Sequence, residues 1–414
     1  MDKKNDPMIR FHNYKELWEC DRLKNIFRTI RNAYVGTATP YYVEKGHFYL
    51  ESNNVKNGKI NYNSQIFIND EFYEKQRDKW LKTNDIVMVQ SGHVGHTAVI
   101  PKELNNTAAH ALIVFTDYKK EVNPHFLNYQ FQSSSKRKEL DLISTGNTIK
   151  HILASEMKSF KMDFPTIEEQ SAIGSLFCTL DDLLVSYKDN LANYQFLKAT
   201  MLSKMFPKAG QTVPEIRLDG FEGEWEAQTL KELASFSKGN GYTKNDLVNS
   251  GEEIILYGRL YTNYQTIISK VNTFVTTVKA NAVISKGGEV IVPASGESAE
   301  DISRASVVDK SGVILGGDLN IIYPDENKVD SIFLALTISN GSQQKELIKR
   351  AQGKSIVHLR NNDLEKVVLH YPSLKEQQAI GSYFSNLDNL INSHQEKISQ
   401  LETLKKKLLQ DMFI

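Results

Sequence analysis

The strongest constraint on this chain is an internal repeat whose spacing is half its length. Residues 164–177 read FPTIEEQSAIGSLF and residues 371–384 read YPSLKEQQAIGSYF, 207 positions apart in a chain of 414. An ungapped comparison of 164–206 with 371–413 gives 17 identities in 43 positions. A repeat of this length predicts a fold made of two copies of one structural unit.

The repeat extends beyond this segment, but it has gaps. At the same spacing GNTIKH (146–151) matches GKSIVH (353–358), and between about 30–144 and 237–351 the halves diverge almost completely. Each half is therefore predicted to have a shared frame around a private middle. The starts of the halves also match, with Pro7, Ile9, Arg10, Trp18, Glu19 and Leu23 facing Pro214, Ile216, Arg217, Trp225, Glu226 and Leu230.

A strand followed by a long helix is predicted at the end of each half. Thr166-x-x-Glu169 and Ser373-x-x-Glu376 match a capping box, in which the carboxylate returns to the helix start. Apolar residues then recur in steps of three and four, so we expect coiled-coil helices of about 36 residues, roughly 50 Å long. The seam positions are Ile173, Phe177, Leu180, Leu184 and Leu191 in the first helix and Ile380, Phe384, Leu387, Ile391, Ile398, Leu401 and Leu408 in the second.

Charged residues on these helices have structural interpretations. Lys198 and Lys405 fall on the seam, where we expect them to extend toward solvent or to set the register. The acidic pairs Glu168/Glu169 and Asp181/Asp182 are interpreted as favourable helix-start or solvated positions. The surplus of leucines beside the seam would suit a further helical partner.

The private middles have the pattern of mixed α/β domains. Strands are predicted at 85–90, 111–116, 288–293 and 319–324, from short apolar runs bounded by turn residues. A short amphipathic helix is predicted at Leu23–Ile30 and at Leu230–Leu233, and a later helix at PHFLNYQFQ and at DSIFLALTIS. The predicted organisation is a first domain at 1–163, a helix at 164–206, a linker at 207–214, a second domain at 215–370 and a helix at 371–414.

Charge and composition narrow the function classes. The chain has 50 basic and 50 acidic residues, with 24 against 19 in residues 1–163 and 18 against 21 in 208–370. A protein that grips a nucleic acid by charge alone has a clear positive excess, so such a partner would be held with help from other subunits. No apolar run approaches the roughly 18 residues of a membrane span, and the polar start is not a signal peptide. We expect a cytoplasmic protein whose two cysteines, Cys20 and Cys178, are packing residues.

Catalytic motifs are missing from the sequence. It contains no phosphate-binding G-x-x-x-x-G-K-[ST], no G-x-G-x-x-G, no G-x-S-x-G and no H-E-x-x-H. His93 and His96 in SGHVGH lack further residues at metal-ligand spacing, so no metal site is predicted. The loops SGHVG and PASGESAED suit binding better than catalysis, and the chain is expected not to be an enzyme.

The arrangement as a whole resembles the DNA-specificity subunit of type I restriction-modification enzymes. The resemblance covers the entire chain and rests on PEIRLDGFEGEWEAQTLKEL, G-x-[ST]-I-x-H and the twofold P-x-x-x-E-Q-x-A-I motif. It implies two target-recognition domains separated by antiparallel spacer helices, and a double-stranded DNA target that is bipartite and asymmetric. It also implies two methyltransferase subunits docked on the helices and restriction subunits in the full complex. S-adenosylmethionine, ATP and magnesium would be bound by those partners, with no cofactor in this chain. We expect the isolated chain to bind DNA weakly.

The candidate DNA contacts are basic and aromatic residues of the two domains, each of which is also compatible with an ordinary solvated surface. One rival interpretation is the recognition module of another bipartite-site restriction system. A second is a scaffold that presents two unlike domains to protein partners without binding DNA, and an enzyme with an unrecognised site would show turnover by the purified chain. The candidates are Lys24, Arg28, Arg31, Lys59, His93, His96, Lys136, Arg137, Lys138 and Lys150 in the first domain and Lys238, Arg259, Tyr261, Lys286, Arg304, Lys354 and Arg360 in the second.

Overall fold

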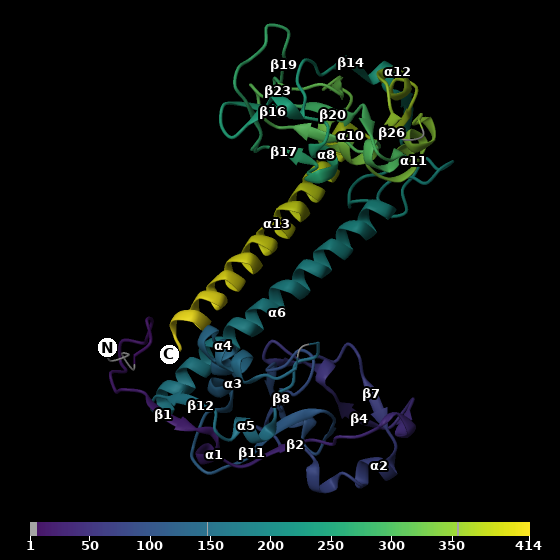
Figure 1. The fold of residues 1–414 in the computed structure, drawn as a ribbon. Helices are drawn as coiled ribbons and strands as arrows, with labels where there is room; N and C mark the ends of the chain where they lie inside the picture. Colours follow the sequence, from purple (N-terminus) through teal and green to yellow (C-terminus); the bar gives the residue numbers. More distant parts are fainter. Residues whose placement is uncertain (1–5, 147, 354–355) are drawn as a thin grey trace. The chain divides into compact units, whose positions relative to one another are not determined.

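The computed structural model describes residues 6–146, 148–353 and 356–414, which form two compact units (Figure 1). The first unit comprises Met1–Lys188 with Glu396–Ile414, and the second comprises Asp189–Gln395. The two predicted long helices are α6 (Ile167–Lys204) and α13 (Leu374–Asp411), each of 38 residues. Each unit therefore contains a domain together with part of both helices. No helix in the described part of the chain is long and apolar enough to cross a membrane.

The first domain is built on a four-stranded antiparallel sheet in the order β2-β11-β8-β9. The predicted strands at 85–90 and 111–116 are confirmed as β8 (Ile86–Val89) and β11 (Leu112–Tyr118), whose apolar runs are buried. A second sheet has the order β10-β4-β7-β3, and β5 pairs with β6. The other elements are β1 (Glu19–Arg22), α1 (Leu23–Ile26), β2 (Phe27–Asn32), β3 (Tyr42–Val43), β4 (His47–Leu50), β5 (Val55–Lys56), β6 (Lys59–Ile60), β7 (Ile66–Ile68), α2 (Asp70–Glu74), β9 (Thr97–Val99), β10 (Ala108–Ala109), α3 (Pro124–Gln132), α4 (Ser134–Ile143), α5 (Ala154–Met157) and β12 (Lys161–Phe164).

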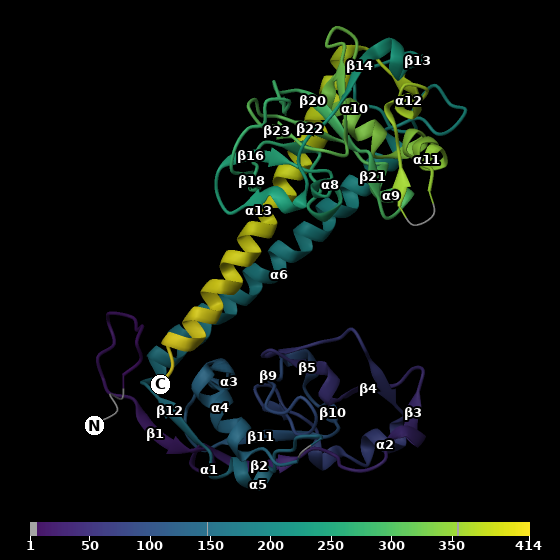
Figure 2. The same ribbon diagram turned by 45° about the horizontal axis from the view of Figure 1, so that its top comes forward.

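The second domain contains two five-stranded sheets, β14-β24-β20-β22-β17 and β15-β18-β16-β23-β19 (Figure 2). The predicted strands at 288–293 and 319–324 are confirmed as β20 (Glu289–Pro293) and β24 (Leu319–Pro324). The other elements are β13 (Glu226–Thr229), α7 (Leu230–Leu233), β14 (Ala234–Lys238), β15 (Leu247–Val248), β16 (Glu252–Ile255), α8 (Arg259–Thr262), β17 (Ile267–Ile268), β18 (Phe274–Val275), β19 (Val283–Ile284), β21 (Ser295–Gly296), α9 (Ala299–Ile302), β22 (Ser306–Val308), β23 (Ile314–Leu315), α10 (Ser331–Ile338), α11 (Gly341–Arg350), β25 (Val357–His358), α12 (Asn361–Leu364) and β26 (Val368–Tyr371).

The structural repeat reaches further into the middles than the sequence identities do. Strands β11 and β24 begin 207 positions apart, and so do helices α3 and α10 and helices α4 and α11. The predicted divergence of 30–144 and 237–351 concerns sequence identities, and the matching helices predicted at PHFLNYQFQ and DSIFLALTIS are confirmed as α3 and α10. Because packing requires apolar residues of suitable volume rather than particular ones, the pattern survives after the identities are lost.

The helix predicted at Leu23–Ile30 is only partly correct. Helix α1 is a single turn, and the chain continues as strand β2, where Phe27 faces Tyr118 and Ile30 faces Phe115 across the ladder with β11. The apolar spacing fits a helix locally, but pairing with a buried strand outweighs it. The prediction at Leu230–Leu233 is confirmed as α7, which strand β14 follows.

Both units contain an equivalent aromatic cluster, which attaches the domain to its long helix. In the first unit Trp18 packs edge-on against Phe126 with ring centroids 5.6 Å apart, and Phe177 stacks on Phe413 at 5.8 Å. The second unit repeats both contacts: Trp225 lies 5.6 Å from Phe333, and Phe384 lies 6.2 Å from Phe206. All of these side chains are buried, so the start of each half, its domain helix and its long helix share one core.

The glutamate of the repeated motif forms an ion pair instead of a capping box. Glu169 accepts hydrogen bonds from Nε and Nη2 of Arg10, both at 2.8 Å, and Glu376 accepts the same two bonds from Arg217 at 2.7 Å. Both glutamates are buried. The predicted box is therefore wrong in its carboxylate half, as is the solvated interpretation of Glu169. An arginine 159 positions upstream in each half takes the carboxylate because a buried charge requires a charged partner.

The glutamine and glycine of the motif attach the long helix to a helix of the domain. Oε1 of Gln170 accepts from the backbone N–H of Asn123, the residue that caps α3, and its Nε2 donates to the Pro165 carbonyl. Gln377 makes the equivalent bonds to Asp330 and Pro372. A Cβ on Gly174 would lie 2.9 Å from Oδ1 of Asn123, so only glycine allows this approach.

The two long helices run antiparallel within each unit. In the first unit Lys405 pairs with Asp181 at 2.5 Å and Lys188 with Glu402 at 2.6 Å. In the second, Lys198 pairs with Asp388 at 2.5 Å. The seam lysines therefore set the register, and the solvated interpretation of Asp181 is wrong because its carboxylate is buried. The buried seam residues are Ile173, Phe177, Leu180, Leu184, Ile380, Phe384, Leu387, Ile391 and Leu401, while Leu191, Ile398 and Leu408 are half-buried.

Candidate nucleic-acid interface

A groove of about 740 Å³ lies in the first unit between the β5–β6 hairpin, helix α4 and the two long helices. Three predicted residues meet here: Lys59 from β6, His96 from the glycine loop and Arg137 from α4. The long helices contribute the opposite wall. The lining comprises Lys56, Asn57, Lys59, His96, Gln132, Ser134, Arg137, Asp181, Leu184, Val185, Lys188, Glu402, Lys405, Lys406 and Leu409.

The first-unit groove is strongly basic, with six lysine or arginine side chains against two carboxylates. Both carboxylates are already engaged, since Asp181 pairs with Lys405 and also accepts from the Tyr129 hydroxyl, while Glu402 pairs with Lys188. Lys59 lies 3.9 Å from Asp181, too far for a strong bond. Among the described residues, Lys56, Lys406 and Arg137 have no carboxylate within ion-pair distance. The groove therefore keeps unbalanced positive charge.

His96 and Arg137 are neighbours at one side of this groove. Nη2 of Arg137 lies 3.2 Å from Nδ1 of His96, which also accepts from the backbone N–H of Asn57. Burial, with the nearby charges of Arg137 and Lys56, lowers the pKa of His96 to about 4. The imidazole is thus neutral at physiological pH and accepts from the guanidinium. Burial also lowers the pKa of Arg137, and the charge of nearby Asp141 opposes this shift only in part.

The second unit has a groove at the equivalent place, but its lining is different. It consists of two adjoining hollows of about 320 and 260 Å³ that share Lys198, Tyr264 and Thr266. At a spacing of 207, Gln344 replaces Arg137 and Asn392 replaces Val185, and the domain also contributes Thr266, the residue before β17. The charged residues of this lining are Lys198, Arg304, Asp309 and Asp388, so the second-unit groove has no net charge. Arg304 stands over the Tyr264 ring at 5.8 Å.

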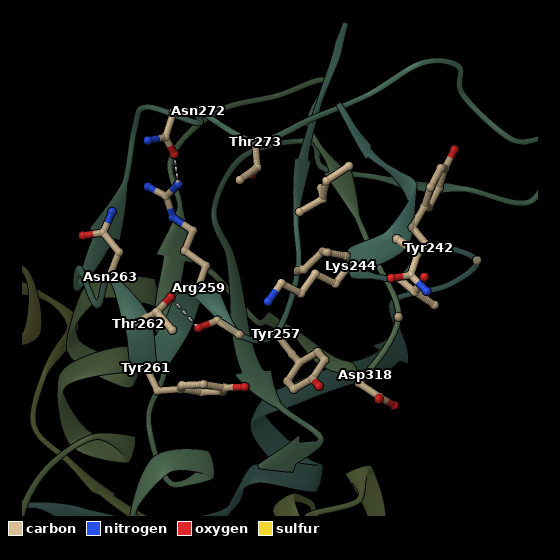
Figure 3. A pocket seen from close by; sticks show the side chains of 17 residues that line it. Tyr242, Lys244, Tyr257, Arg259, Tyr261, Thr262, Asn263, Asn272, Thr273 and Asp318 are labelled. Atoms are coloured by element: carbon tan, nitrogen blue, oxygen red, sulfur yellow. Dashed lines mark hydrogen bonds between the residues drawn. The ribbon is translucent and has the colours of Figure 1, made fainter. Parts of the chain in front are cut away.

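A separate pocket of about 840 Å³ opens in the second domain beside helix α8 (Figure 3). It brings together the predicted residues Arg259 and Tyr261, and adds Lys244, which sequence reasoning missed. Arg259 donates to Oδ1 of Asn272, to Gln265 and to the Lys270 carbonyl, all of them neutral acceptors. Burial lowers its pKa, and its Nε has no hydrogen-bond partner in the described structure. Tyrosine and amide side chains make up much of the remaining lining, which also includes the carboxylate of Asp318: Tyr242, Asn245, Tyr257, Asn263 and Asn272.

The remaining predicted residues of the first domain do not line the first-unit groove. Lys24 and Arg28 are exposed on α1 and β2, at the sheet edge opposite β9, and Arg31 donates to the Lys79 carbonyl at 3.0 Å. The prediction for Lys136 conflicts with the structure, because this side chain is buried and pairs with Asp163 at 2.8 Å. His93 and Lys138 are exposed, and the exposed Lys150 pairs with Asp141.

In the second domain the remaining predicted residues are scattered. Lys238 ends β14, Lys286 lies in the turn before β20, and Arg360 precedes α12; all three are exposed. Lys354 lies outside the described residues. Sequence reasoning missed Lys56, Lys188 and Lys406 in the first-unit groove. Their positions on the outer faces of a hairpin and two helices look like ordinary surface until the elements are brought together.

Comparison with known proteins identifies the family. The family model described as "Type I restriction modification DNA specificity domain" matches residues 16–193 and again 222–403. The MjaVIII type I restriction enzyme specificity subunit of Methanocaldococcus jannaschii is 21% identical over 96% of this chain and 94% of its own length. The putative MjaX specificity subunit of the same organism is 22% identical over 95% of this chain and 92% of its own.

Solved structures show the same fold. The crystal structure of a type I restriction-modification system S subunit from M. genitalium covers 99% of both chains, with a TM-score of 0.63 and 16% sequence identity. At this level of identity the likeness speaks for the fold alone. Together with two family matches that span most of the sequence, it shows that this chain belongs to the type I restriction-modification DNA specificity family.

Proposed function

We propose that this chain is the DNA-recognition subunit of a type I restriction-modification complex and reads a bipartite, asymmetric target in double-stranded DNA. The observation that carries the proposal is the presence of two specificity domains on one structural frame, each with a different lining around its grooves. Two domains on an antiparallel helix pair would meet two segments of a duplex, as dimeric readers meet two half-sites. Because the linings differ, the half-sites differ in sequence.

The pocket beside α8 suits base reading in the second half-site. Arginine pairs bidentately with guanine, and asparagine pairs with adenine, through the base edges in the major groove. Arg259 is held by neutral acceptors and keeps its full charge for such a contact, with Asn263 and Asn272 beside it. Tyr257 and Tyr261 line the same pocket and would supply apolar surface.

The long helices would dock the methyltransferase subunits. Four large apolar side chains of these helices are 41–75% exposed, although helix surfaces normally carry polar residues. They are Leu183 and Leu404 in the first unit and Phe196 and Leu390 in the second. Leu183 and Leu390 occupy equivalent positions of the repeat, which favours two copies of one partner. Restriction subunits would complete the assembly. S-adenosylmethionine, ATP and magnesium would be bound by these partners, and the complex would act on DNA in the cytoplasm.

A domain exchange tests this function. Residues 30–144 would be replaced by the equivalent segment of another family member, and the methylated sites of a host carrying the complete system would be read by methylome sequencing. We expect one half of the target to change and the other half to persist. A change in both halves, or in neither, would contradict the assignment of one domain to each half-site.

A helix deletion tests the spacer role separately. Removal of one turn from α6 or α13 should alter the spacer of the target or abolish DNA binding, while any remaining sites keep both half-sites. The scaffold alternative is tested by an electrophoretic shift with a pool of genomic fragments and the methyltransferase subunits. Retention of selected sequences supports DNA recognition, whereas subunit binding without retention of DNA supports a scaffold.

A further inference from the structure

We infer that the two units share the work on DNA unequally: the first-unit groove holds the phosphate backbone, whereas the second-unit groove makes uncharged contacts. This inference rests on the proposed function and adds which surface of this chain supplies the salt-dependent part of the affinity. It follows from the difference between two grooves that each lie beside the long helices and beside one of the matching helices α4 and α11.

The first-unit groove has cations on both of its walls. Lys56 and Lys59 belong to the β5–β6 hairpin, while Lys188 and Lys406 belong to the long helices on the other side. A polyanion in the groove would be contacted from two sides. A cationic ligand would find no free carboxylate in the groove, because Asp181 and Glu402 are paired with Lys405 and Lys188.

Arg137 strengthens the argument for an anion. Its guanidinium is half-buried, and its hydrogen-bond partner is the neutral ring of His96, so the cost of burying the charge is not offset by an ion pair. A phosphate oxygen at this position would supply the missing partner, since guanidinium matches phosphate geometry in bidentate form.

The second-unit groove has no net positive charge, although its Arg304 also has no carboxylate within ion-pair distance among the described residues. Its two lysine or arginine residues are balanced by two carboxylates, and Lys198 is bound to Asp388 at 2.5 Å. Gln344, which stands where the first unit has Arg137, carries no charge, and neither does the lining residue Thr266. The whole-domain balance agrees, with a basic excess only in residues 1–163. Counterion release on DNA binding should therefore come from the first unit.

An acidic segment of a partner protein is the competing occupant of the first-unit groove. DNA is favoured because the free cations lie on separate elements along both walls, as a continuous backbone requires, and because the chain belongs to a DNA specificity family. The salt dependence of DNA binding and the retention of the methyltransferase subunits distinguish the two occupants.

The test uses the complex of this chain with its methyltransferase subunits and a triple variant, Lys56→Gln with Lys59→Thr and Lys406→Gln. Binding of random-sequence duplex DNA is measured by fluorescence anisotropy as a function of KCl concentration. The slope of log affinity against log salt concentration is negative, and each lost phosphate contact makes it less steep by about one. We therefore expect the steepness to decrease by about three in the triple variant. The methylated sites in a host should keep the same sequence. The control, Lys45→Gln with Lys75→Gln and Lys102→Gln, removes equal charge from exposed positions of the same unit outside the groove, and should change the slope by less than one.

Two results would overturn the inference. The first is a slope in the groove variant equal to that of the control. The second is loss of the methyltransferase subunits on size-exclusion chromatography with an unchanged slope for the bound fraction, which would make the groove a protein interface. Failure of the proposed function gives a different result, because the unmodified complex would then select no sequence from a genomic pool.

Discussion

The grooves of the two units differ in charge although the long helices and the matching helices α4 and α11 contribute to both. Arg137 in the first unit corresponds to Gln344 in the second, yet both units keep one lysine–aspartate pair between the long helices, Lys405–Asp181 and Lys198–Asp388. The buried positions that hold a domain on its helix have been kept, while the exposed lining has changed freely. A specificity protein can thus alter what each domain reads without altering how the domain is mounted.

The comparison predicts equal losses when the shared core is damaged. Phe177→Ala in the first unit and Phe384→Ala in the second each remove a fully buried ring, and should cost about 3–5 kcal/mol of unfolding free energy. The measurement is urea unfolding in single-tryptophan variants that keep Trp18 or Trp225, one buried in each unit. Strongly unequal losses of unfolding free energy would show that the two aromatic clusters do not stabilise their units equally.

The arginine–glutamate pair should give the next largest effect. Arg10→Ala and Arg217→Ala each leave a buried carboxylate without its partner, so we expect a loss of about 3 kcal/mol in the unit concerned. Arg10→Lys is the matched control, because it keeps the charge but not the two parallel bonds, and should lose less. An unchanged stability of Arg10→Ala in the same urea assay would argue against the role of this pair.

On DNA the two units should respond in different ways. Arg259→Gln should relax one position of the second half-site by about 1–3 kcal/mol of discrimination, because a base contact is lost. Arg137→Gln, which installs the residue of the second unit, should weaken binding to all sequences alike. Affinities for a panel of single-base target variants measure both effects. A sequence-selective effect of Arg137→Gln would reverse the roles assigned to these residues.

The glycines of the repeated motif, Gly174 and Gly381, allow a further comparison of how the two domains pack on their long helices. A Cβ at position 174 would lie 2.9 Å from Oδ1 of Asn123, whereas at position 381 it would lie 3.3 Å from Oδ1 of Asp330. Alanine gains about 1 kcal/mol in helix propensity over glycine, which offsets a mild clash but not a severe one. We expect Gly174→Ala to destabilise the first unit by about 1 kcal/mol and Gly381→Ala to be near neutral. Thermal unfolding of both variants decides this.

A pH dependence of stability is expected in the first unit, where His96 lies. The pKa of His96 falls from 6.5 to about 4 in the fold, so the unfolded chain binds a proton at a pH where the native state does not. Stability from this group is present above pH 6.5 and is lost as the pH falls toward 4. His96→Gln should flatten this part of the stability profile of the first unit, measured by urea unfolding between pH 4 and 7.

Much of the fold could be predicted from local patterns. The 207-residue spacing, the long apolar seam and the strands β8, β11, β20 and β24 all follow from periodicity, which is a property of neighbouring residues. The role of Glu169 could not be obtained in this way, because its partner Arg10 lies 159 positions away and a capping box is equally consistent with the local sequence. The strand identity of Phe27 and Ile30 likewise depends on β11, which lies some 85 residues later in the chain.

For the candidate interface the division is similar. Repeats and apolar patterns run along the chain, so local sequence was enough to predict two domains, their approximate bounds and the family that the chain resembles. It could not predict that Lys56, Arg137 and Lys406 line one groove, or that Lys136 beside Arg137 is buried against Asp163. A charge acquires its function from the groups that surround it in space, and those groups come from elements far apart in sequence.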